Sequence, residues 1–277
     1  MTADVEHRHD GKVIVERIPV DERGSVLGLI TFNRPDEMNP FDMDTGVVVH
    51  RLFRDLAEDP AVRVVAVTGA GKAFSAGGDM EKYRTLQRDP VEFPKFLDIM
   101  HGACTMIAEQ PKPFVALVNG IAIAGGIELL LSCDLAIAAE SARIGDAHLP
   151  YGQMGGGGVL TLLPRAVGPA RARELIFSGR LLTAAEACDW GLVSKVVPDD
   201  ELRAAGIAFA ADVAKKSPLA VANAKQVLNT AWWDGTGVPQ GLRLEREVTA
   251  RYCLTSEDAP EGLAAFAAKR RPVFTGR

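Results

Sequence analysis

GIAIAGGIELLLSCD, residues 120–134, decides the expected fold because it passes from strand-like to helix-like sequence within a few residues. Ala124, Gly125 and Gly126 stand where the strand is expected to give way to the helix. The first N–H groups of such a helix have no partner within it, and the helix dipole favours negative charge at that end. We therefore expect this turn to stabilise an oxygen atom that becomes anionic during a reaction.

The same stretch carries one acidic residue in an apolar setting. Glu128 follows Gly125 by three residues, so its carboxylate is expected on the same helical face, one turn from the Gly125 amide. It is the only charged residue between Lys112 and Asp134. A carboxylate in so apolar a run usually has a partner or a chemical role. The alternative is that Glu128 is only an acidic residue favoured by the dipole of the first turn.

A second glycine turn, GAGKAFSAGGD at residues 69–79, also follows a strand-like run. A dinucleotide-binding fingerprint would need glycine where Phe74 stands, and a P-loop needs a longer spacing before its lysine. A nucleophile elbow around Ser75 would need glycine where Ala73 stands. What remains is a turn whose small side chains leave backbone amides open to a ligand, or an ordinary glycine turn.

Outward from these two turns, strand and helix patterns alternate. KVIVERI and SVLGLITF predict a hairpin, and helical spacing from Asp42 ends at Asp59-Pro60 before the strand VRVVAVTG. A helix is expected over 91–109, followed by the strands PFVALVNG and DLAIAA. Beyond about residue 169 the strand signal fades and helices are expected near 170–177, 183–190, 199–215, 218–231 and 256–270. These patterns predict an α/β protein with a β/α core over residues 1–200 and a helical region over 201–277.

Composition limits the classes of partner and compartment. A net charge of -5 and a pI near 5.6 in a chain of 277 residues argue against nucleic-acid binding. The four cysteines show neither zinc-ligand nor disulfide spacing, so we expect no metal and a reducing cytoplasm. The N-terminus shows no secretory signal pattern. The longest apolar run, 113–139, contains Asn119, Glu128 and Asp134, so we expect buried core and no membrane partner.

The two turns together resemble a known family. KAFSAGGD and NGIAIAGGIELLLSCD are similar to the paired signature of the crotonase, or enoyl-CoA hydratase/isomerase, superfamily. Further similarity comes from ITFNRP, the stretch from Gly158 to Gly168, LTAAEACDWGLVSKVVP and EGLAAFAAKRRPVF, and it extends from about residue 12 to residue 274. The resemblance implies a crotonase-like ββα spiral core with a helical C-terminal region that serves oligomerisation, as a homotrimer or a dimer of trimers.

The resemblance also implies roles for single residues. It places the two amides of an oxyanion hole at Gly78 and Gly125 and the first catalytic glutamate at Glu128. Contacts to coenzyme A are expected from Met38, on the pantetheine, and from Lys72, Ala73, Ala76, Phe266 and Lys269, the last two approaching from a neighbouring subunit. No separate cofactor is expected, since coenzyme A is carried as part of the acyl-CoA substrate.

At one position the chain departs from the family pattern. A hydratase of the family generally has a second glutamate where IGDAHLPYG carries His148. An imidazole, with an ordinary pKa of about 6.5, can donate or accept a proton, and Asp146 and Tyr151 are close enough in sequence to orient it. His148 therefore replaces the second glutamate, indicates a different reaction of the family, or is a polar loop residue with a satisfied hydrogen bond.

These observations predict an enoyl-CoA hydratase that adds water to a trans-2-enoyl-CoA through a stabilised thioester enolate. Two alternatives stay open within the family: an enoyl-CoA isomerase, or a hydrolase that cleaves a C–C bond of a 3-oxoacyl-CoA or β-diketone. A third alternative is a noncatalytic acyl-CoA-binding protein.

Overall fold

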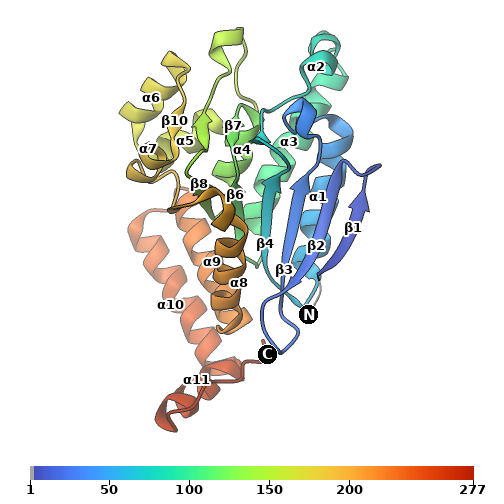
Figure 1. Cartoon of the computed structure of the whole chain (residues 1–277). Coiled ribbons are helices and arrows are strands. Elements are labelled where there is room, and N and C mark those ends of the chain that lie inside the picture. Colours follow the sequence, from blue (N-terminus) through green and yellow to red (C-terminus); the bar gives the residue numbers. More distant parts are fainter. Residues whose placement is uncertain (1–2) are drawn as a thin grey trace.

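Two β-sheets form the centre of the computed structural model, which describes residues 3–277 (Figure 1). The larger sheet has the strand order β1-β2-β3-β4-β6-β8-β11 and the smaller one β10-β9-β7-β5. The strands are β1 (Asp4–Arg8), β2 (Val13–Pro19), β3 (Val26–Phe32), β4 (Val62–Gly69), β5 (Ala73–Ser75), β6 (Phe114–Val118), β7 (Ile121–Ile123), β8 (Leu135–Ala139), β9 (Arg143–Gly145), β10 (Leu182–Thr183) and β11 (Lys195–Val197).

The chain winds between the two sheets in repeating steps. β1, β2 and β3 pair antiparallel, whereas β3, β4, β6, β8 and β11 pair parallel. Each of β4, β6 and β8 is followed within a few residues by a strand of the small sheet, β5, β7 or β9, and then by helical structure. This is the ββα spiral that the sequence resemblance implies, so the predicted α/β fold is confirmed.

Helices cover the sheets and make up most of the C-terminal third (Figure 1). The α-helices are α1 (Met43–Glu58), α2 (Met80–Leu86), α3 (Glu92–Glu109), α4 (Gly125–Ser132), α5 (Val159–Val167), α6 (Pro169–Ser178), α7 (Ala184–Asp189), α8 (Leu202–Ala214), α9 (Pro218–Trp233), α10 (Val238–Thr255) and α11 (Asp258–Ala267). Three short 3₁₀ helices are η1 (Pro35–Glu37), η2 (Leu149–Tyr151) and η3 (Asp199–Glu201). No helix within residues 3–277 combines the length and the apolar composition needed to cross a bilayer.

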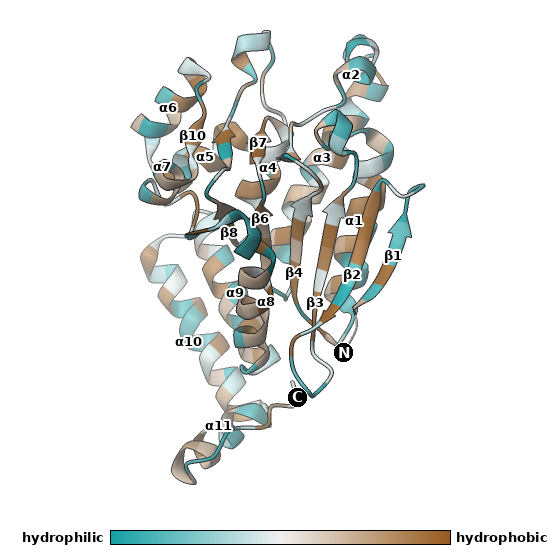
Figure 2. Ribbon diagram, in the orientation of Figure 1, coloured by the Kyte–Doolittle hydropathy of each residue, from teal (hydrophilic) through white to brown (hydrophobic). Residues whose placement is uncertain are grey.

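The central strands of the large sheet are buried on both faces, which explains their nearly continuous apolar sequences. Along β4, Val65 and Val67 contribute to one apolar cluster, while Val64 and Ala66 contribute to the cluster on the opposite face. Figure 2 shows the resulting apolar colouring of β3 and β4 and the polar colouring of the edge strand β1. Strand alternation thus separates the core that supports the site from the core beneath α8.

The C-terminal region differs from expectation in one element. The sequence predicts no helix between 231 and 256, yet α10 occupies Val238–Thr255. Val248 is its only buried residue, and its first turn contains Pro239 and Gly241, which are typical of turns. α8 packs on the large sheet through Leu202 and Ala210, whereas α11 lies at the end of the molecule opposite α2 (Figure 1). The division at residue 200 stays a prediction.

Candidate active site

The two glycine turns predicted from the sequence lie against each other. One follows β5 and the other joins β7 to α4. A methyl group at Gly125 would lie 3.2 Å from Gly77 Cα and 3.9 Å from Gly78 N, and one at Gly77 would lie only 2.8 Å from Gly125 N. Side chains larger than hydrogen would push the turns apart, so glycine is required for their close approach.

Two backbone amides are free where the turns meet. Neither the Gly78 nor the Gly125 N–H has an acceptor among the described residues 3–277, while the neighbouring Gly77 and Asp79 amides are bonded to Ser75 Oγ and to Phe41 O. Ala124, which precedes Gly125, has φ 49° and ψ -121°, a conformation costing about 1–3 kcal/mol for a residue with a Cβ. Paired free donors beside a strained residue form an arrangement able to bind an oxyanion.

Glu128 lies one helical turn after Gly125, as predicted, and is 4% exposed. Its Oε1 accepts hydrogen bonds from Gly157 N at 2.8 Å and from Val159 N at 3.4 Å. Burial raises the pKa of this carboxyl above its usual range, and this effect outweighs the opposing influence of nearby His148 and of the two N–H donors. A carboxylate with a raised pKa is suited to proton transfer near neutral pH.

His148 follows the small-sheet strand β9 and is held by a second buried carboxylate. Its Nδ1 lies 2.6 Å from Asp146 Oδ1, and Asp146 is 1% exposed. Burial alone would lower the pKa of His148, but the hydrogen bond and the charge of Asp146, together with the charge of Glu128, raise it above its ordinary value. The Nε2 atom makes no hydrogen bond to any residue in the described range, which leaves it available to a ligand.

Glu128 and His148 face the same small space. A methyl group at Gly155 would lie 2.9 Å from Glu128 Oε1 and 3.4 Å from His148 Cε1. A methyl group at Gly157 would lie 2.7 Å from Glu128 Oε2. The glycine-rich loop therefore lets the backbone reach the carboxylate of Glu128 while keeping the space between this carboxylate and the His148 imidazole open.

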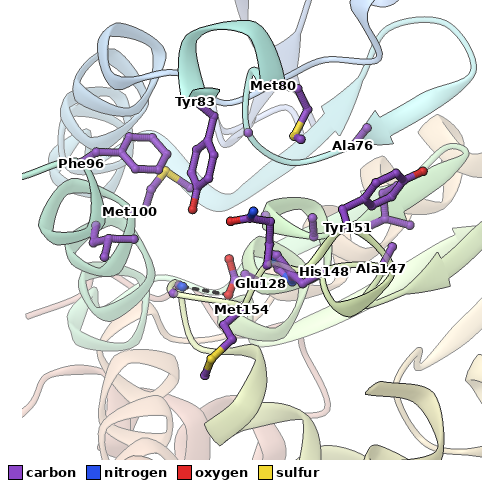
Figure 3. A pocket seen from close by; sticks show the side chains of 18 residues that line it. Ala76, Met80, Tyr83, Phe96, Met100, Glu128, Ala147, His148, Tyr151 and Met154 are labelled. Atoms are coloured by element: carbon purple, nitrogen blue, oxygen red, sulfur yellow. Dashed lines mark hydrogen bonds between the residues drawn. The ribbon is translucent and has the colours of Figure 1, made fainter. Parts of the chain in front are cut away.

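A cavity of about 340 Å³ connects these groups (Figure 3). Gly78, Gly125, Glu128 and His148 line it, and the Tyr83 hydroxyl points into it. Most of the remaining wall is apolar and comes from α2, α3, the end of β7 and the loop after η2: Met80, Phe96, Leu97, Met100, Ile123 and Met154. The cavity thus presents two free backbone amides, a carboxylate and an imidazole beside a hydrophobic surface.

Comparison with known proteins agrees with this geometry. The family model described as enoyl-CoA hydratase/isomerase matches residues 22–277. The chain belongs to the enoyl-CoA hydratase/isomerase family. It is 36% identical to a probable enoyl-CoA hydratase of Mycobacterium bovis over 92% of this chain and 97% of that one. It is 32% identical to a crotonyl-CoA hydratase of Syntrophomonas wolfei over 92% and 97% of the two chains.

Solved structures of the enoyl-CoA hydratase/isomerase family share the whole fold. An enoyl-CoA hydratase from Bacillus anthracis superposes with a TM-score of 0.87, 31% identity and 100% coverage of both chains. An enoyl-CoA hydratase from Geobacillus kaustophilus superposes with a TM-score of 0.89, 28% identity and the same coverage. The likeness covers the helical C-terminal region as well as the spiral core.

Within this family fold, the residues predicted to contact coenzyme A lie in different settings. Ala76 lines the cavity. Lys72 is exposed, whereas the next residue, Ala73, is buried in β5. The Met38 carbonyl accepts a hydrogen bond from Ala76 N. Phe266, 84% exposed, and Lys269 are at the α11 end of the molecule, opposite α2 (Figure 1). The single chain therefore does not bring these two residues to the cavity.

Sequence reasoning missed most of the apolar wall and the two amides that hold Glu128. The wall residues of α2 and α3 carry no motif, because any large apolar side chain fills such a surface. The Gly157 and Val159 amides lie at the start of α5, and the four glycines that precede this helix were the available signal. A glycine run before a helix start leaves exposed N–H groups that a carboxylate can reach.

Proposed function

We propose that the protein hydrates a trans-2-enoyl-CoA through a stabilised thioester enolate. The observation that carries the proposal is one cavity in which two free amides, Gly78 and Gly125, lie beside two proton-transfer groups, Glu128 and His148. Its curated relatives named as hydratases support the same reaction. Because an enoyl-CoA hydratase acts on acyl-CoA, the expected role is in the breakdown or synthesis of acyl chains. The expected compartment is the cytoplasm.

The two amides act on the thioester carbonyl. When water adds to the β-carbon, negative charge develops on the thioester oxygen, and hydrogen bonds from Gly78 N–H and Gly125 N–H become stronger than they were to the neutral carbonyl. Such donors are set in place before the reaction, so they stabilise the enolate without rearrangement. The amides therefore lower the barrier to attack.

Glu128 and His148 divide the two proton transfers. Ionised Glu128 takes a proton from water as the oxygen attacks the β-carbon, and protonated His148 delivers a proton to the α-carbon as the enolate collapses. The raised pKa of His148 keeps a larger fraction of the imidazole protonated near neutral pH. The histidine thus performs the step assigned to the second glutamate of the family, with Asp146 as its partner.

Coenzyme A is bound as part of the substrate, across a subunit boundary. Within one chain, Lys72, Ala73 and Ala76 contact the adenine and phosphates, and Met38 contacts the pantetheine. Phe266 and Lys269 reach the adenine and phosphates from a neighbouring chain. The exposure of Phe266, Leu254 and Leu263 in a single chain supports burial of this region in a homotrimer or a dimer of trimers.

One observation favours a second candidate, cleavage of a C–C bond in a 3-oxoacyl-CoA or β-diketone. An imidazole at position 148, paired with buried Asp146, is also suited to activating water for attack on a carbonyl. The oxyanion site would then stabilise the enolate that leaves. An isomerase would use the same enolate but needs only one proton-shuttling group.

Product analysis separates these reactions. Incubation with crotonyl-CoA in deuterated, ¹⁸O-labelled water is expected to give 3-hydroxybutyryl-CoA with the label at the β-carbon and deuterium at the α-carbon. An isomerase would give a double-bond isomer of the substrate without ¹⁸O, and a C–C hydrolase would give two fragments from a β-diketone and no reaction with crotonyl-CoA. Binding of crotonyl-CoA with no product would show a noncatalytic protein.

A further inference from the structure

Arg34 lies behind the oxyanion turn and contacts both segments that hold it. The segment at Phe41 pairs with the turn at Gly78: Phe41 N donates to Gly77 O at 2.7 Å, and Asp79 N donates to Phe41 O at 3.1 Å. These two bonds flank Gly78, so they determine the direction of its free N–H. Whatever fixes the two segments relative to each other also fixes one of the two oxyanion donors.

The guanidinium of Arg34 bridges two carboxylates: Asp42, which follows Phe41, and Asp79, which follows Gly78. Its Nη1 lies 3.1 Å from Asp42 Oδ2 and its Nη2 lies 3.0 Å from Asp79 Oδ2. The Arg34 side chain is 11% exposed and the Asp42 side chain only 3%. A planar guanidinium with several donors suits such a bridge, whereas the single ammonium of lysine does not.

Each of these carboxylates also begins a helix. Asp42 Oδ1 accepts from Thr45 N at 2.8 Å and caps α1, and Asp79 Oδ1 accepts from Lys82 N at 3.2 Å and caps α2. The oxygens not used in capping are the ones that Arg34 binds. Arg34 therefore ties the starts of two helices to each other across the strand pairing at Gly78.

Asp42 stays ionised in its buried position and has partners besides Arg34. Although burial opposes ionisation of Asp42, its hydrogen bonds to Lys82 and Thr45 hold the pKa of this carboxyl well below its ordinary value. Arg34 also pairs with the more exposed Glu37, so removing the arginine would leave three acidic groups close together, with Lys82 as the remaining cation bound to Asp42. Their repulsion would favour separation of the two segments.

We propose that Arg34 is a positioning residue for the oxyanion site: by bridging Asp42 and Asp79 it keeps the Gly78 N–H aimed at the thioester oxygen. The inference rests on the proposed function only in requiring that an enolate forms against Gly78 and Gly125. Arg34 is not among the residues that line the cavity, and its side chain bonds to Glu37, Asp42 and Asp79. It acts on the reaction through the geometry of the Gly78 donor.

The enolate of bound acetoacetyl-CoA measures this geometry without Glu128 or His148 chemistry, because its ultraviolet absorbance reports the ratio of enolate to keto form. The wild-type protein is expected to raise this ratio above that of free acetoacetyl-CoA. Arg34→Met is expected to lower the ratio about tenfold or more and to lower kcat for crotonyl-CoA to a similar degree, with KM changing less. Asp79→Asn is expected to lower the enolate ratio and kcat less than Arg34→Met does, because asparagine still caps α2 and Arg34 keeps its bond to Asp42.

Arg203→Met is the matched control. Arg203 makes a two-pronged ion pair with Glu16 on the opposite part of the fold, so its loss is expected to leave the enolate ratio and kcat within about twofold of wild type. A folded Arg34→Met protein with the wild-type ratio would overturn the inference. Should that variant not fold, a wild-type ratio in Asp79→Asn would overturn it. A wild-type protein that does not raise the ratio would instead overturn the proposed oxyanion site itself, and the role of Arg34 with it.

Discussion

His148 Nδ1 and Asp146 Oδ1 are 2.6 Å apart, and both side chains are largely withdrawn from solvent. This pair holds the imidazole at the cavity that Glu128 also lines, and within residues 3–277 it leaves Nε2 without a hydrogen-bond partner. It also couples the protonation of His148 to a buried negative charge. The chemistry available at position 148 is therefore a property of the pair and not of the histidine alone.

Asp146→Asn tests that coupling through the pH dependence of activity. Because Asp146 raises the pKa of His148, its replacement is expected to lower that pKa, and protonated His148 is the active form. The alkaline limb of the profile of kcat/KM against pH should move to lower pH, with the acid limb less affected. An alkaline limb that stays in place would contradict a role for protonated His148.

Gly157→Ala tests how Glu128 is held. The added methyl group would lie 2.7 Å from Glu128 Oε2, so the carboxylate must move, and a displacement of about 1 Å can lower kcat about 100-fold. Gly241→Ala is the matched control, since a methyl group there meets nothing within 4 Å, and it should keep full activity. Equal kcat values for the two variants, measured with crotonyl-CoA, would show that the glycine loop does not position Glu128.

Glu128→Gln is expected to be more stable than the wild-type protein at alkaline pH. The folded pKa of Glu128 is raised, so its contribution to stability is complete below the unfolded pKa and is lost as pH rises through the folded pKa. The neutral amide does not titrate and keeps an oxygen for the Gly157 and Val159 amides. The difference in Tm between variant and wild type should therefore be largest above the folded pKa and shrink on acidification; a difference that grows on acidification would contradict the raised pKa.

Lys269→Ala tests the contribution of a neighbouring subunit to coenzyme A binding. Loss of one contact to a phosphate is expected to raise KM for crotonyl-CoA by about tenfold with little change in kcat. The same variant should not change KM for a short thioester that lacks the nucleotide. Lys215→Ala is the control, because Lys215 is exposed and, within residues 3–277, its side chain pairs with Asp212 alone. An unchanged KM for crotonyl-CoA would place the nucleotide elsewhere.

The sequence predicted the turns of the site better than its walls. Gly125 and Glu128 stood out locally, because a glycine turn at a helix start and an isolated charge leave strong signals, whereas Gly78 was identified through the family resemblance. The cavity wall formed by Met80, Phe96 and Met100 left none, since these residues follow the same apolar spacing as any core helix. The sequence pointed to Arg34 only as part of the ITFNRP resemblance. Its contacts with Asp42 and Asp79 could not be predicted, because only the fold brings these residues together.

The elements of the C-terminal region show the same division. α9 was predicted from its apolar spacing, but α10 exposes nearly all of its side chains and was not. The small-sheet strands β5, β7 and β9 are three residues long, too short for an alternation pattern to identify them. Their presence follows from the spiral, in which each is placed by the longer strand before it.

The rate of crotonyl-CoA hydration by wild-type protein and Glu128→Gln tests the central claim most directly. Both proteins would be followed by loss of the conjugated enoyl absorbance at equal concentration, after circular dichroism shows that both are folded. The account predicts steady hydration by the wild-type protein and a rate about 10²–10⁴-fold lower for the variant, since general base catalysis is lost while the oxyanion amides remain. Equal rates for the two proteins would contradict it.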